Sequence, residues 1–271
     1  MNEVNKIFSL KDGITQEHLD FYKKYGFVHF EKFLSEDQLK VIWASVAEAH
    51  KHIINNNIDK INGIPLKYGV DENNNKIVQR LAFTNKVAKE VEKLYSHPVF
   101  EQLKQFIPDY PSRLSTDEKD GAVCNYFVNV ENSIYKQMGW HTDVLRDFLM
   151  LRKVLPMINV GVYFDDSGEE NGGLRILTGT HTQSFWSMMF RKRQVADKKV
   201  DPDELLVVAK AGDLVLHDGR LWHRVAKSPH IGAKSRRRVM YIPLICGKQD
   251  IRIPETKTPF YHKMNKMFRF D

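Results

Sequence analysis

From Ala122 onwards the chain is a succession of short strand-like runs, and this pattern limits its fold more than any other feature. Turn signals such as DDSGEENGG, TGTH, AGD and HDGR separate several of the runs. Many short strands with glycine-rich turns favour a sandwich or barrel over alternating strand–helix units. We therefore expect a mainly β fold with flanking helices. The runs are VCNYFVNV, INVGVYF, LRIL, LVVAK, LVLH, LWHRV and RVMYIPLI.

The first 121 residues have a mainly helical pattern around one short strand. Residues from about Thr15 to Tyr25 are amphipathic, and Gly26 follows where a helix C′ glycine belongs. The run Phe27–Phe30 has the aromatic and β-branched composition of a strand. Ser35, with Gln38 three residues later, forms a capping-box pattern that predicts the start of a second helix.

Asparagine-rich segments at 55–57 and 71–76 predict the end of that second helix and a loop. A further helix is expected at about 85–95. Inside the β region, helical patterns cover residues 144–155 and 184–195, and their apolar side chains make these two segments the candidate lids of a substrate pocket. Cationic residues in the first of them could meet an acidic group on a substrate: Arg146, Arg152 and Lys153.

The size and composition fit one domain. The chain has 271 residues, of which 42% are hydrophobic, enough for one substantial core. We expect a single domain over residues 1–271, with a β core at 122–250 and a tail at 251–271. No apolar run approaches the length of about 18 residues that a membrane span needs, and no signal-peptide pattern is present. The two cysteines, Cys124 and Cys246, lie outside any CxxC pair, which is typical of a reduced, cytoplasmic protein.

The charge balance is basic, with a formal net charge of +7. Such a charge would suit nucleic acid, an acidic membrane surface or an anionic substrate. The lysines and arginines are scattered, however, and their clusters are small. A nucleic-acid demethylase would need a continuous basic groove with stacking aromatic side chains. The sequence shows no such pattern, so we expect no nucleic-acid partner.

The motif that carries chemistry is Trp140-His141-Thr142-Asp143. Residues i and i+2 of a strand point to the same side, so His141 and Asp143 can converge on one point. A histidine from a neighbouring strand would complete a face of two histidines and one carboxylate. That face suits iron(II), because it leaves open positions for a chelating co-substrate and for dioxygen. An HxD pair alone is weak evidence, since it arises by chance in many proteins.

Two histidines compete for the place of the third ligand. His223 is favoured, because it begins a late strand after the tight turn HDGR. His217, six residues earlier, is the rival, and its ordinary interpretation is a turn histidine that hydrogen-bonds locally. His181 follows Gly179-Thr180 in a similar turn and is better explained as a structural residue.

At these motifs the chain resembles the phytanoyl-CoA dioxygenase family of iron(II)/2-oxoglutarate oxygenases. The resemblance covers most of the sequence. The motifs occur in the same order as in the family, which makes each of them stronger evidence. The motifs are Phe21–Val28 with Phe33–Ser35, then Trp140–Asp143, then Glu170–Ile176 continuing to Gly179–His181, and last Lys210–Leu214 leading to Gly219–His223.

The resemblance implies a double-stranded β-helix, a cupin-like jelly roll wrapped by helices, in which His141, Asp143 and His223 hold iron(II). It also implies 2-oxoglutarate and dioxygen as co-substrates, with an arginine on the strand after the second histidine binding the far carboxylate of 2-oxoglutarate. A guanidinium suits this role because its planar fork pairs with both carboxylate oxygens. Arg237 and Arg238 are the candidates, and strand alternation lets one of them face inward. We prefer Arg237.

Other side chains are candidates for the walls of the same site. Gln137, Asn129 and Asn159 could reach the co-substrate or the substrate from strands on either side of the HxD motif. Tyr163 shares a face with Asn159, and Trp140 adjoins the motif, so both are candidates for the substrate pocket. For each of these residues, plain packing in the β core is the alternative.

The predicted function is hydroxylation of a small organic molecule, apolar or mixed in character and with a place for an acidic group. In the halogenases of the family that this chain resembles, a small residue stands in place of the motif's carboxylate, so that chloride can bind iron. In this chain the carboxylate is present as Asp143. The same iron centre could instead perform desaturation, cyclisation or epimerisation. A cupin-like binding protein without catalysis is a further alternative, which the intact ligand set and the arginines disfavour. The oligomeric state is left open.

Overall fold

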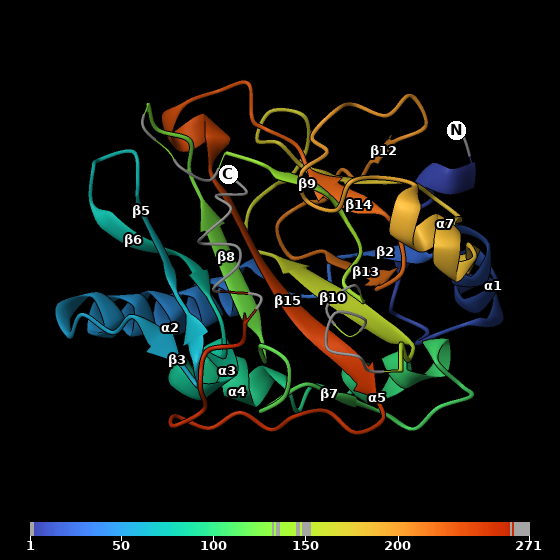
Figure 1. Ribbon diagram of the computed structural model, residues 1–271, viewed down its shortest axis with the longest axis horizontal. Coiled ribbons are helices and arrows are strands. Elements are labelled where there is room, and N and C mark those ends of the chain that lie inside the picture. The colour runs from blue at the N-terminus through green and yellow to red at the C-terminus, as the bar shows by residue number, and fades with distance from the viewer. Residues whose placement is uncertain are drawn as a thin grey trace.

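Two facing β-sheets form the centre of the molecule, and helices cover the outer side of the larger one (Figure 1). The computed structural model describes residues 3–131, 133, 136–144, 147, 153–260 and 262. This architecture confirms the expected mainly β fold with flanking helices and a jelly-roll core. Among the described helices, none is long and apolar enough to cross a membrane.

Within the described residues the larger sheet has nine strands, in the order β1-β2-β13-β10-β15-β8-β6-β5, with β7 paired to β15. All pairs are antiparallel except β1 with β2. Strands from the first 121 residues therefore complete this sheet at both edges. The strands are β1 (Phe8–Ser9), β2 (Phe27–Glu31), β5 (Lys67–Val70), β6 (Lys76–Leu81), β7 (Ser112–Leu114), β8 (Val123–Phe127), β10 (Met157–Tyr163), β13 (Leu214–Asp218) and β15 (Arg237–Cys246).

The smaller sheet has the strand order β12-β11-β14-β9 among the described residues. Its strands are short, and they carry the HxD motif at the end of β9 and the late histidine at the start of β14. The strands are β9 (Met138–His141), β11 (Leu174–Ile176), β12 (Leu205–Leu206) and β14 (His223–Val225); β3 (Lys60–Ile61) and β4 (Ile64–Pro65) form a separate two-stranded sheet.

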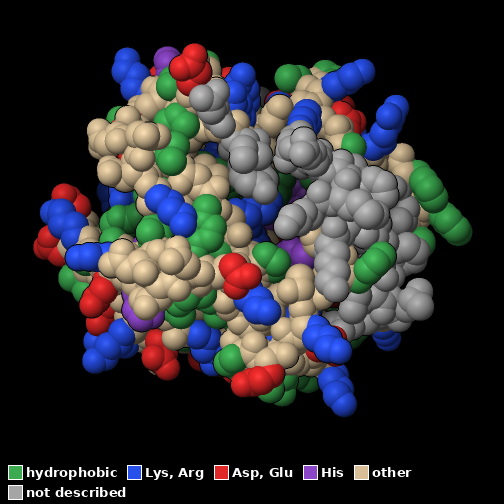
Figure 2. Space-filling model, turned by 60° about the vertical axis from the view of Figure 1, so that its left-hand side comes forward, with side chains coloured by type: hydrophobic (Ala, Val, Ile, Leu, Met, Phe, Trp, Pro, Cys, Tyr) green, Lys and Arg blue, Asp and Glu red, His purple; other side chains and the backbone are tan. Residues whose placement is uncertain are grey.

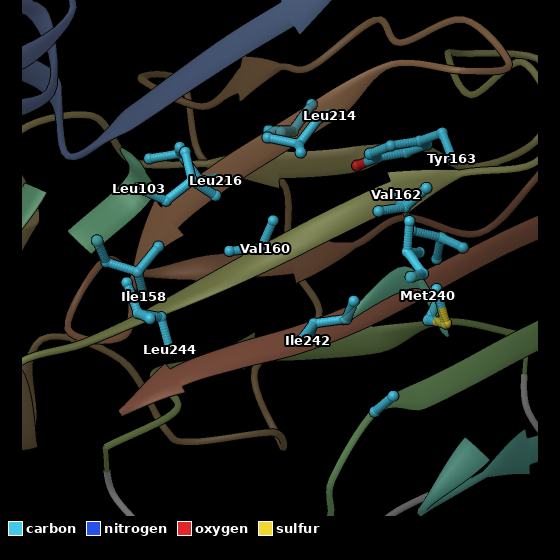
Figure 3. Close-up of a cluster of buried hydrophobic side chains, with 14 of the residues drawn as sticks. Leu103, Ile158, Val160, Val162, Tyr163, Leu214, Leu216, Met240, Ile242 and Leu244 are labelled. Atoms are coloured by element: carbon cyan, nitrogen blue, oxygen red, sulfur yellow. The ribbon is translucent and has the colours of Figure 1, made fainter. Parts of the chain in front are cut away.

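The three central strands of the larger sheet divide their side chains cleanly between two faces. Val160 of β10 is paired with Leu216 of β13 and with Ile242 of β15, and all three are fully buried towards the helices (Figure 3). One residue earlier on β10, Asn159 is paired with His217 and faces the smaller sheet. Because strand side chains alternate, the same strands build the hydrophobic core on one face and line a cavity on the other.

Helices close the outer face of the larger sheet. Thr15 caps the first helix with a capping box, and Gly26 follows it with a left-handed φ of 81°, as expected. The predicted capping box of Ser35 and Gln38 is present at the next helix, where the Ser35 side chain accepts a hydrogen bond from the Gln38 N–H. The helices are α1 (Gln16–Tyr25), α2 (Glu36–Asn55), α3 (Thr84–Val87), α4 (Lys89–Leu94), α5 (Val99–Leu103) and α7 (Phe185–Phe190); single 3-10 turns lie at Glu3–Asn5, Lys104–Phe106, Thr180–Thr182 and Gly232–Ser235.

Three expected elements differ in the structure. The helix expected at 85–95 is interrupted by Ala88, whose extended backbone separates α3 from α4. The asparagine-rich loop at 71–76 closes a hairpin between β5 and β6 that the sequence analysis did not foresee. The helix expected at 184–195 ends at Phe190. Most of the helix expected at 144–155, with Arg146 and Arg152, lies outside the described residues.

Candidate metal centre and its cavity

His141, Asp143 and His223 come together on the inner face of the smaller sheet. Strands β9 and β14 pair with His141 opposite His223, and the two imidazole rings lie 4.1 Å apart between centroids. Asp143 follows two residues later, and its backbone N–H donates to the Gly219 carbonyl at 2.8 Å. One ligand atom of each of the three side chains lies within 4.8 Å of the others. This is a spacing at which a single metal ion can be bound by all three.

The orientation of both imidazoles is fixed by backbone carbonyls. Nδ1 of His141 lies 2.8 Å from the Gly139 oxygen, and Nδ1 of His223 lies 2.9 Å from the Leu221 oxygen. A carbonyl only accepts, so each Nδ1 carries the proton and each Nε2 offers its lone pair. Burial lowers the pKa of His141, and burial together with the neighbouring His141 ring lowers the pKa of His223. Both rings are thus neutral, the form that binds a metal.

Asp143 is held by two side chains that reach across from the larger sheet. Asn159 Nδ2 donates to Oδ2 of Asp143 at 2.8 Å, and His217 Nε2 donates to the same oxygen at 3.3 Å. Burial works against ionisation, but the positive charge that His223 carries when protonated and the hydrogen bond from His217 outweigh it and hold the pKa of Asp143 well below its usual range. The two contacts fix the orientation of the Asp143 carboxylate.

His217 therefore has a different place from the one that the sequence suggested. It is a buried residue of β13 rather than part of a turn, and its ring lies 4.6 Å from that of His223. Its contact with Asp143 orients the carboxylate of a candidate metal ligand. His181 is buried against α1, with Nε2 3.2 Å from the Lys23 carbonyl, as expected of a structural histidine.

A cavity of about 380 Å³ lies between the two sheets, and the three candidate ligands line one part of it. Arg237, at the start of β15, lines the same cavity and is buried. Its guanidinium donates to the carbonyls of Gly172 and Asn171 and lies 5.6 Å from the centroid of the Phe127 ring. Among the described residues no carboxylate pairs with it.

Gly172, whose carbonyl accepts from Arg237, has a positive φ, and a Cβ there would meet the Ala226 carbonyl. This explains the glycine at this position of the ENGG turn.

Arg238 points the other way. Its guanidinium forms two hydrogen bonds with Asp165, at 2.7 and 2.6 Å, and lies 4.3 Å from the centroid of the Trp43 ring on α2. The alternation of β15 thus brings Arg237 into the cavity and directs Arg238 to the helical side. Tyr241, on the inner face of the same strand, lines the cavity with Tyr163 of the neighbouring β10.

The structure brings most of the remaining candidates together and corrects two. Gln137, Asn159 and Tyr163 line the cavity. Trp140 does not: as the neighbour of His141 it faces the opposite side of the sheet, where its Nε1–H donates to the Lys199 carbonyl at 2.9 Å. Asn129 is also outside the cavity, since its amide is directed at the carbonyls of Ser228 and His230.

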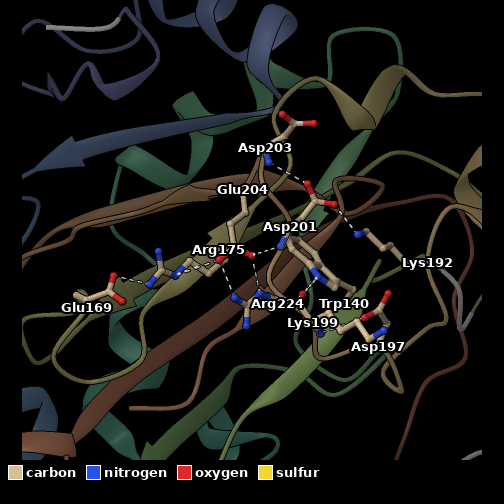
Figure 4. Close-up of polar contacts among 10 residues, drawn as sticks. All are labelled: Trp140, Glu169, Arg175, Lys192, Asp197, Lys199, Asp201, Asp203, Glu204 and Arg224. Carbon is tan, nitrogen blue, oxygen red and sulfur yellow. Dashed lines mark hydrogen bonds and ion pairs between the residues drawn. The ribbon is translucent and has the colours of Figure 1, made fainter. Parts of the chain in front are cut away.

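Trp140 belongs to a polar network on the outer face of the smaller sheet (Figure 4). The buried Arg224 forms two hydrogen bonds with Glu204, at 2.8 and 2.6 Å, and its guanidinium lies 5.5 Å from the centroid of a Trp140 ring. Lys192 lies on a Trp140 ring as well, at 5.3 Å, and donates to Asp201 at 2.5 Å. The network holds β9 and β14 in place from the face of the sheet opposite the cavity. These are the strands that carry the two candidate histidine ligands.

The sequence analysis missed the end of the cavity that lies under β5, β6 and β8. Lys67, Arg80, Asn125 and Lys119 line it. Three of these residues belong to or pair with the β5–β6 hairpin, which joins the sheet through β8. A single sequence gives no signal for such a long-range pairing, because the register is set by tertiary packing.

The fold is a jelly roll, and it brings together a candidate metal site of two histidines and one carboxylate. The chain belongs to the phytanoyl-CoA dioxygenase family, whose sequence pattern it matches over residues 22–237. This membership confirms the resemblance, and it agrees with the expected cofactors, iron(II) and 2-oxoglutarate. No curated protein matches the chain.

Solved structures with a similar fold are only distantly related in sequence. The carbocyclase SnoK from nogalamycin biosynthesis, described as non-haem and alpha-ketoglutarate dependent, is 19% identical, with a TM-score of 0.62 over 94% of this chain and 92% of that chain. The epimerase SnoN in complex with Fe3+, alpha-ketoglutarate and nogalamycin RO is 15% identical, with a TM-score of 0.61 over 89% and 86%. HygX from Streptomyces hygroscopicus, with nickel and 2-oxoglutarate bound, is 14% identical, with a TM-score of 0.55 over 86% of each chain.

Proposed function

We propose that this protein is an iron(II), 2-oxoglutarate-dependent oxygenase that oxidises a small organic molecule. One observation carries the proposal: a buried arginine without a carboxylate partner among the described residues lies in the same cavity as two histidines and an aspartate that converge. A buried unpaired cation costs several kcal/mol. A dicarboxylate that binds a metal at one end and Arg237 at the other removes this cost.

The donor set fits iron(II). Neutral imidazoles and a carboxylate on one face are the ligands that non-haem iron(II) oxygenases use, with open positions opposite. When bound, iron(II) together with 2-oxoglutarate and dioxygen supplies the oxidising power that attacks an unactivated C–H bond, with release of succinate and CO2. His141, Asp143 and His223 would hold the metal, and Arg237 would hold the far carboxylate of 2-oxoglutarate.

The surrounding residues prepare this site before any ligand binds. Asn159 and His217 fix the Asp143 carboxylate, and Asn159 Oδ1 and His217 Nδ1 are buried without a hydrogen-bond partner among the described residues. Such atoms are an unfavourable feature of a folded protein unless a ligand or water meets them. Tyr163 is buried and Tyr241 is partly buried beside Arg237, and both limit the access of bulk water to the guanidinium, which strengthens its pairing with a carboxylate.

The proposed outcome of the reaction is hydroxylation. Asp143 would occupy the coordination position that a halide needs, so wild-type protein with chloride should give no chlorinated product, and recovery of one would overturn this assignment. Cyclisation or epimerisation by the same centre is the second candidate. It is favoured by the fold shared with SnoK, which is named a carbocyclase, and SnoN, which is named an epimerase. Mass spectrometry of the product separates the two, because only hydroxylation adds the mass of one oxygen atom to the substrate.

Anaerobic titration tests the proposed function. Iron(II) should bind at one equivalent per chain, and 2-oxoglutarate should then produce the absorption band of its chelate with iron(II). The His141→Ala variant should show neither. Wild-type protein that binds 2-oxoglutarate equally well without a metal would contradict the proposal.

A further inference from the structure

Residues 193–199, which come after α7, form a segment that covers the free edge of β9, the outermost strand of the smaller sheet. The Trp140 N–H donates to the Asp197 carbonyl at 2.8 Å, and the Val195 N–H donates to the Trp140 carbonyl at 2.6 Å. The Trp140 indole N–H donates to the Lys199 carbonyl, and Figure 4 shows Asp197 and Lys199 beside this ring. The segment therefore pairs with β9 as a further strand would, through both backbone polar groups of Trp140.

The segment lies too close to β9 for a side chain between them. A Cβ at Gly139 would meet the backbone carbonyls of Val195 and Asp197, so glycine is required there. Val195 has a φ of 63°, a left-handed conformation that is costly for a β-branched residue. Such strain persists only where the surrounding contacts determine the conformation, and it is concentrated at functional sites. The contact therefore indicates a role beyond covering a strand edge.

Gln194 connects the segment to the HxD motif. Its Oε1 accepts a hydrogen bond from the Thr142 N–H at 3.1 Å, and its Nε2 lies 3.5 Å from Thr142 Oγ1. Thr142 is buried, and in the described part of the chain its N–H has this one partner. A buried N–H that loses its partner destabilises the conformation that buries it. Gln194 therefore determines the direction of the Thr142 N–H.

The peptide group held by Gln194 lies between two candidate metal ligands. Strand β9 ends at His141, so its pairing with β14 does not extend to the residues that follow. The backbone is held there by other hydrogen bonds: Gln194 accepts from the Thr142 N–H, and the Gly219 carbonyl accepts from the Asp143 N–H at 2.8 Å. The spacing between the donor atoms of His141 and Asp143 depends on this stretch of backbone.

Gln194 and Val195 also line the cavity, beside the candidate ligands. The space-filling view shows a hollow near the centre of the molecule with purple His atoms inside it (Figure 2). Asn159 and His217 reach the Asp143 side chain from the larger sheet. Gln194 acts from the side of the smaller sheet and on the backbone, so its contribution is separate from theirs.

We propose that Gln194 is a positioning residue of the metal site, which holds the backbone between His141 and Asp143 in the conformation that binds the ion. This inference rests on the proposed function and adds a residue to that same site. Gln194 acts through Thr142 rather than as a ligand. Contacts that orient metal ligands raise metal affinity by about 10–100-fold.

The experiment compares metal binding by wild-type protein and by Gln194 variants, with iron(II) under anaerobic conditions and with cobalt(II). Gln194→Met keeps the length of the side chain but removes the acceptor oxygen, so it should weaken iron(II) affinity about tenfold. It should also change the visible spectrum of the cobalt(II) protein, which reports the coordination geometry. Gln194→Glu keeps an acceptor oxygen and should show the wild-type cobalt(II) spectrum.

Gln183→Met is the matched control. Gln183 Nε2 donates to the Arg220 carbonyl at 3.3 Å, so this variant also removes a hydrogen bond from a glutamine to the backbone. Gln183 lies outside the cavity lining, and its variant should bind iron(II) as the wild type does. An equal loss of affinity in Gln183→Met and Gln194→Met would overturn the proposal. A weaker affinity in Gln194→Met with an unchanged cobalt(II) spectrum would overturn it too, because reduced stability alone would explain that result.

Two substitutions of Val195 test the segment through its backbone. Val195→Pro excludes a positive φ and removes the N–H that donates to Trp140, so it should weaken iron(II) affinity as Gln194→Met does. Val195→Gly accommodates a positive φ and should bind iron(II) more tightly than Val195→Pro. Wild-type affinity in Val195→Pro would show that the 193–199 segment does not position the ligands.

The wild-type titration separates this inference from the proposed function. Wild-type protein that binds one equivalent of iron(II), together with Gln194→Met of the same affinity, would overturn only the positioning role. Wild-type protein that binds no iron(II) would overturn the proposed function itself.

Discussion

At the scale of single residues, the sharpest contrast is between two adjacent arginines. Arg237 is buried in the cavity and Arg238 pairs with Asp165 on the other face. Arg237→Ala should weaken 2-oxoglutarate binding by about 2–4 kcal/mol, because one half of a buried charge pair is lost. Arg237→Lys should recover only part of this, since a lysine lacks the bidentate fork. The measurement is the 2-oxoglutarate dissociation constant of iron(II)-loaded protein.

Arg238→Ala is the matched control for that measurement. It should lower the stability of the fold, through loss of the Asp165 pair, and leave 2-oxoglutarate affinity near the wild-type value. A larger loss of affinity in Arg238→Ala than in Arg237→Ala would show that the co-substrate anchor has been assigned to the wrong residue.

His217 should behave differently from the three candidate ligands. His141→Ala, Asp143→Ala and His223→Ala should each abolish iron binding, because each removes a donor atom. His217→Ala removes only the hydrogen bond that orients Asp143, so it should weaken iron(II) affinity by about 10–100-fold, as for other residues that position metal ligands. Iron titration of the four variants checks this. Tight iron binding in His223→Ala together with loss of iron binding in His217→Ala would show that His217, and not His223, is the third ligand.

The residue-level successes and errors have identifiable physical origins. The HxD spacing predicted that His141 and Asp143 converge. In the structure β9 ends at His141, and Asp143 is brought to the same place by the following turn, where its backbone N–H donates to the Gly219 carbonyl. The two-residue period of a strand excludes Trp140 from the pocket, as the direct neighbour of His141. The role of His217 was hidden, since its sequence neighbours Asp218 and Gly219 resemble a turn, whereas its contacts depend on its pairing with Asn159.

At the scale of elements, β10, β13 and β15 each contribute one face to the hydrophobic core and the opposite face to the cavity. Leu216 is fully buried on the helical face, one residue from His217 on the cavity face. Leu216→Ala should reduce the free energy of unfolding by about 2–5 kcal/mol, because it leaves a void in the core. Folded protein of this variant should bind iron(II) as the wild type does. Denaturant unfolding and iron titration together make the test.

Val41→Ala provides the comparison for that substitution. Val41 is 54% exposed on α2, so its truncation should change the free energy of unfolding by no more than about 0.5 kcal/mol. If Leu216→Ala were as mild as Val41→Ala, the helical face of β13 would not be the packed core that the structure shows.

Local signals predicted some elements well and others not at all. The caps of α1 and α2 were predictable, since Thr15, Gly26 and Ser35 act on backbone groups within a few residues. The β5–β6 hairpin was not, because its asparagine-rich turn is indistinguishable from a loop until β8 offers a partner strand. The end of the cavity under β5, β6 and β8 depends on that hairpin, so it could not be inferred from the sequence.

At the scale of the whole molecule, the site joins the two sheets. The candidate ligands belong to the smaller sheet and its following loop, while Asn159, His217 and Arg237 belong to the larger one. A bound metal should therefore stabilise the entire fold. At a concentration 100 times its dissociation constant, a metal ion should add about 2.7 kcal/mol to the free energy of unfolding. Chelator-treated protein should lose this gain, and His141→Ala should never show it; an equal gain in that variant would indicate another site.

The most direct test of the account is a crystal structure of the protein grown anaerobically with iron(II) and 2-oxoglutarate. The account predicts one iron, identified by its anomalous signal, bound by Nε2 of His141, Nε2 of His223 and a carboxylate oxygen of Asp143. It also predicts the far carboxylate of 2-oxoglutarate on the guanidinium of Arg237. Iron held by other side chains, or 2-oxoglutarate bound at Arg80 and Lys67 instead, would contradict it.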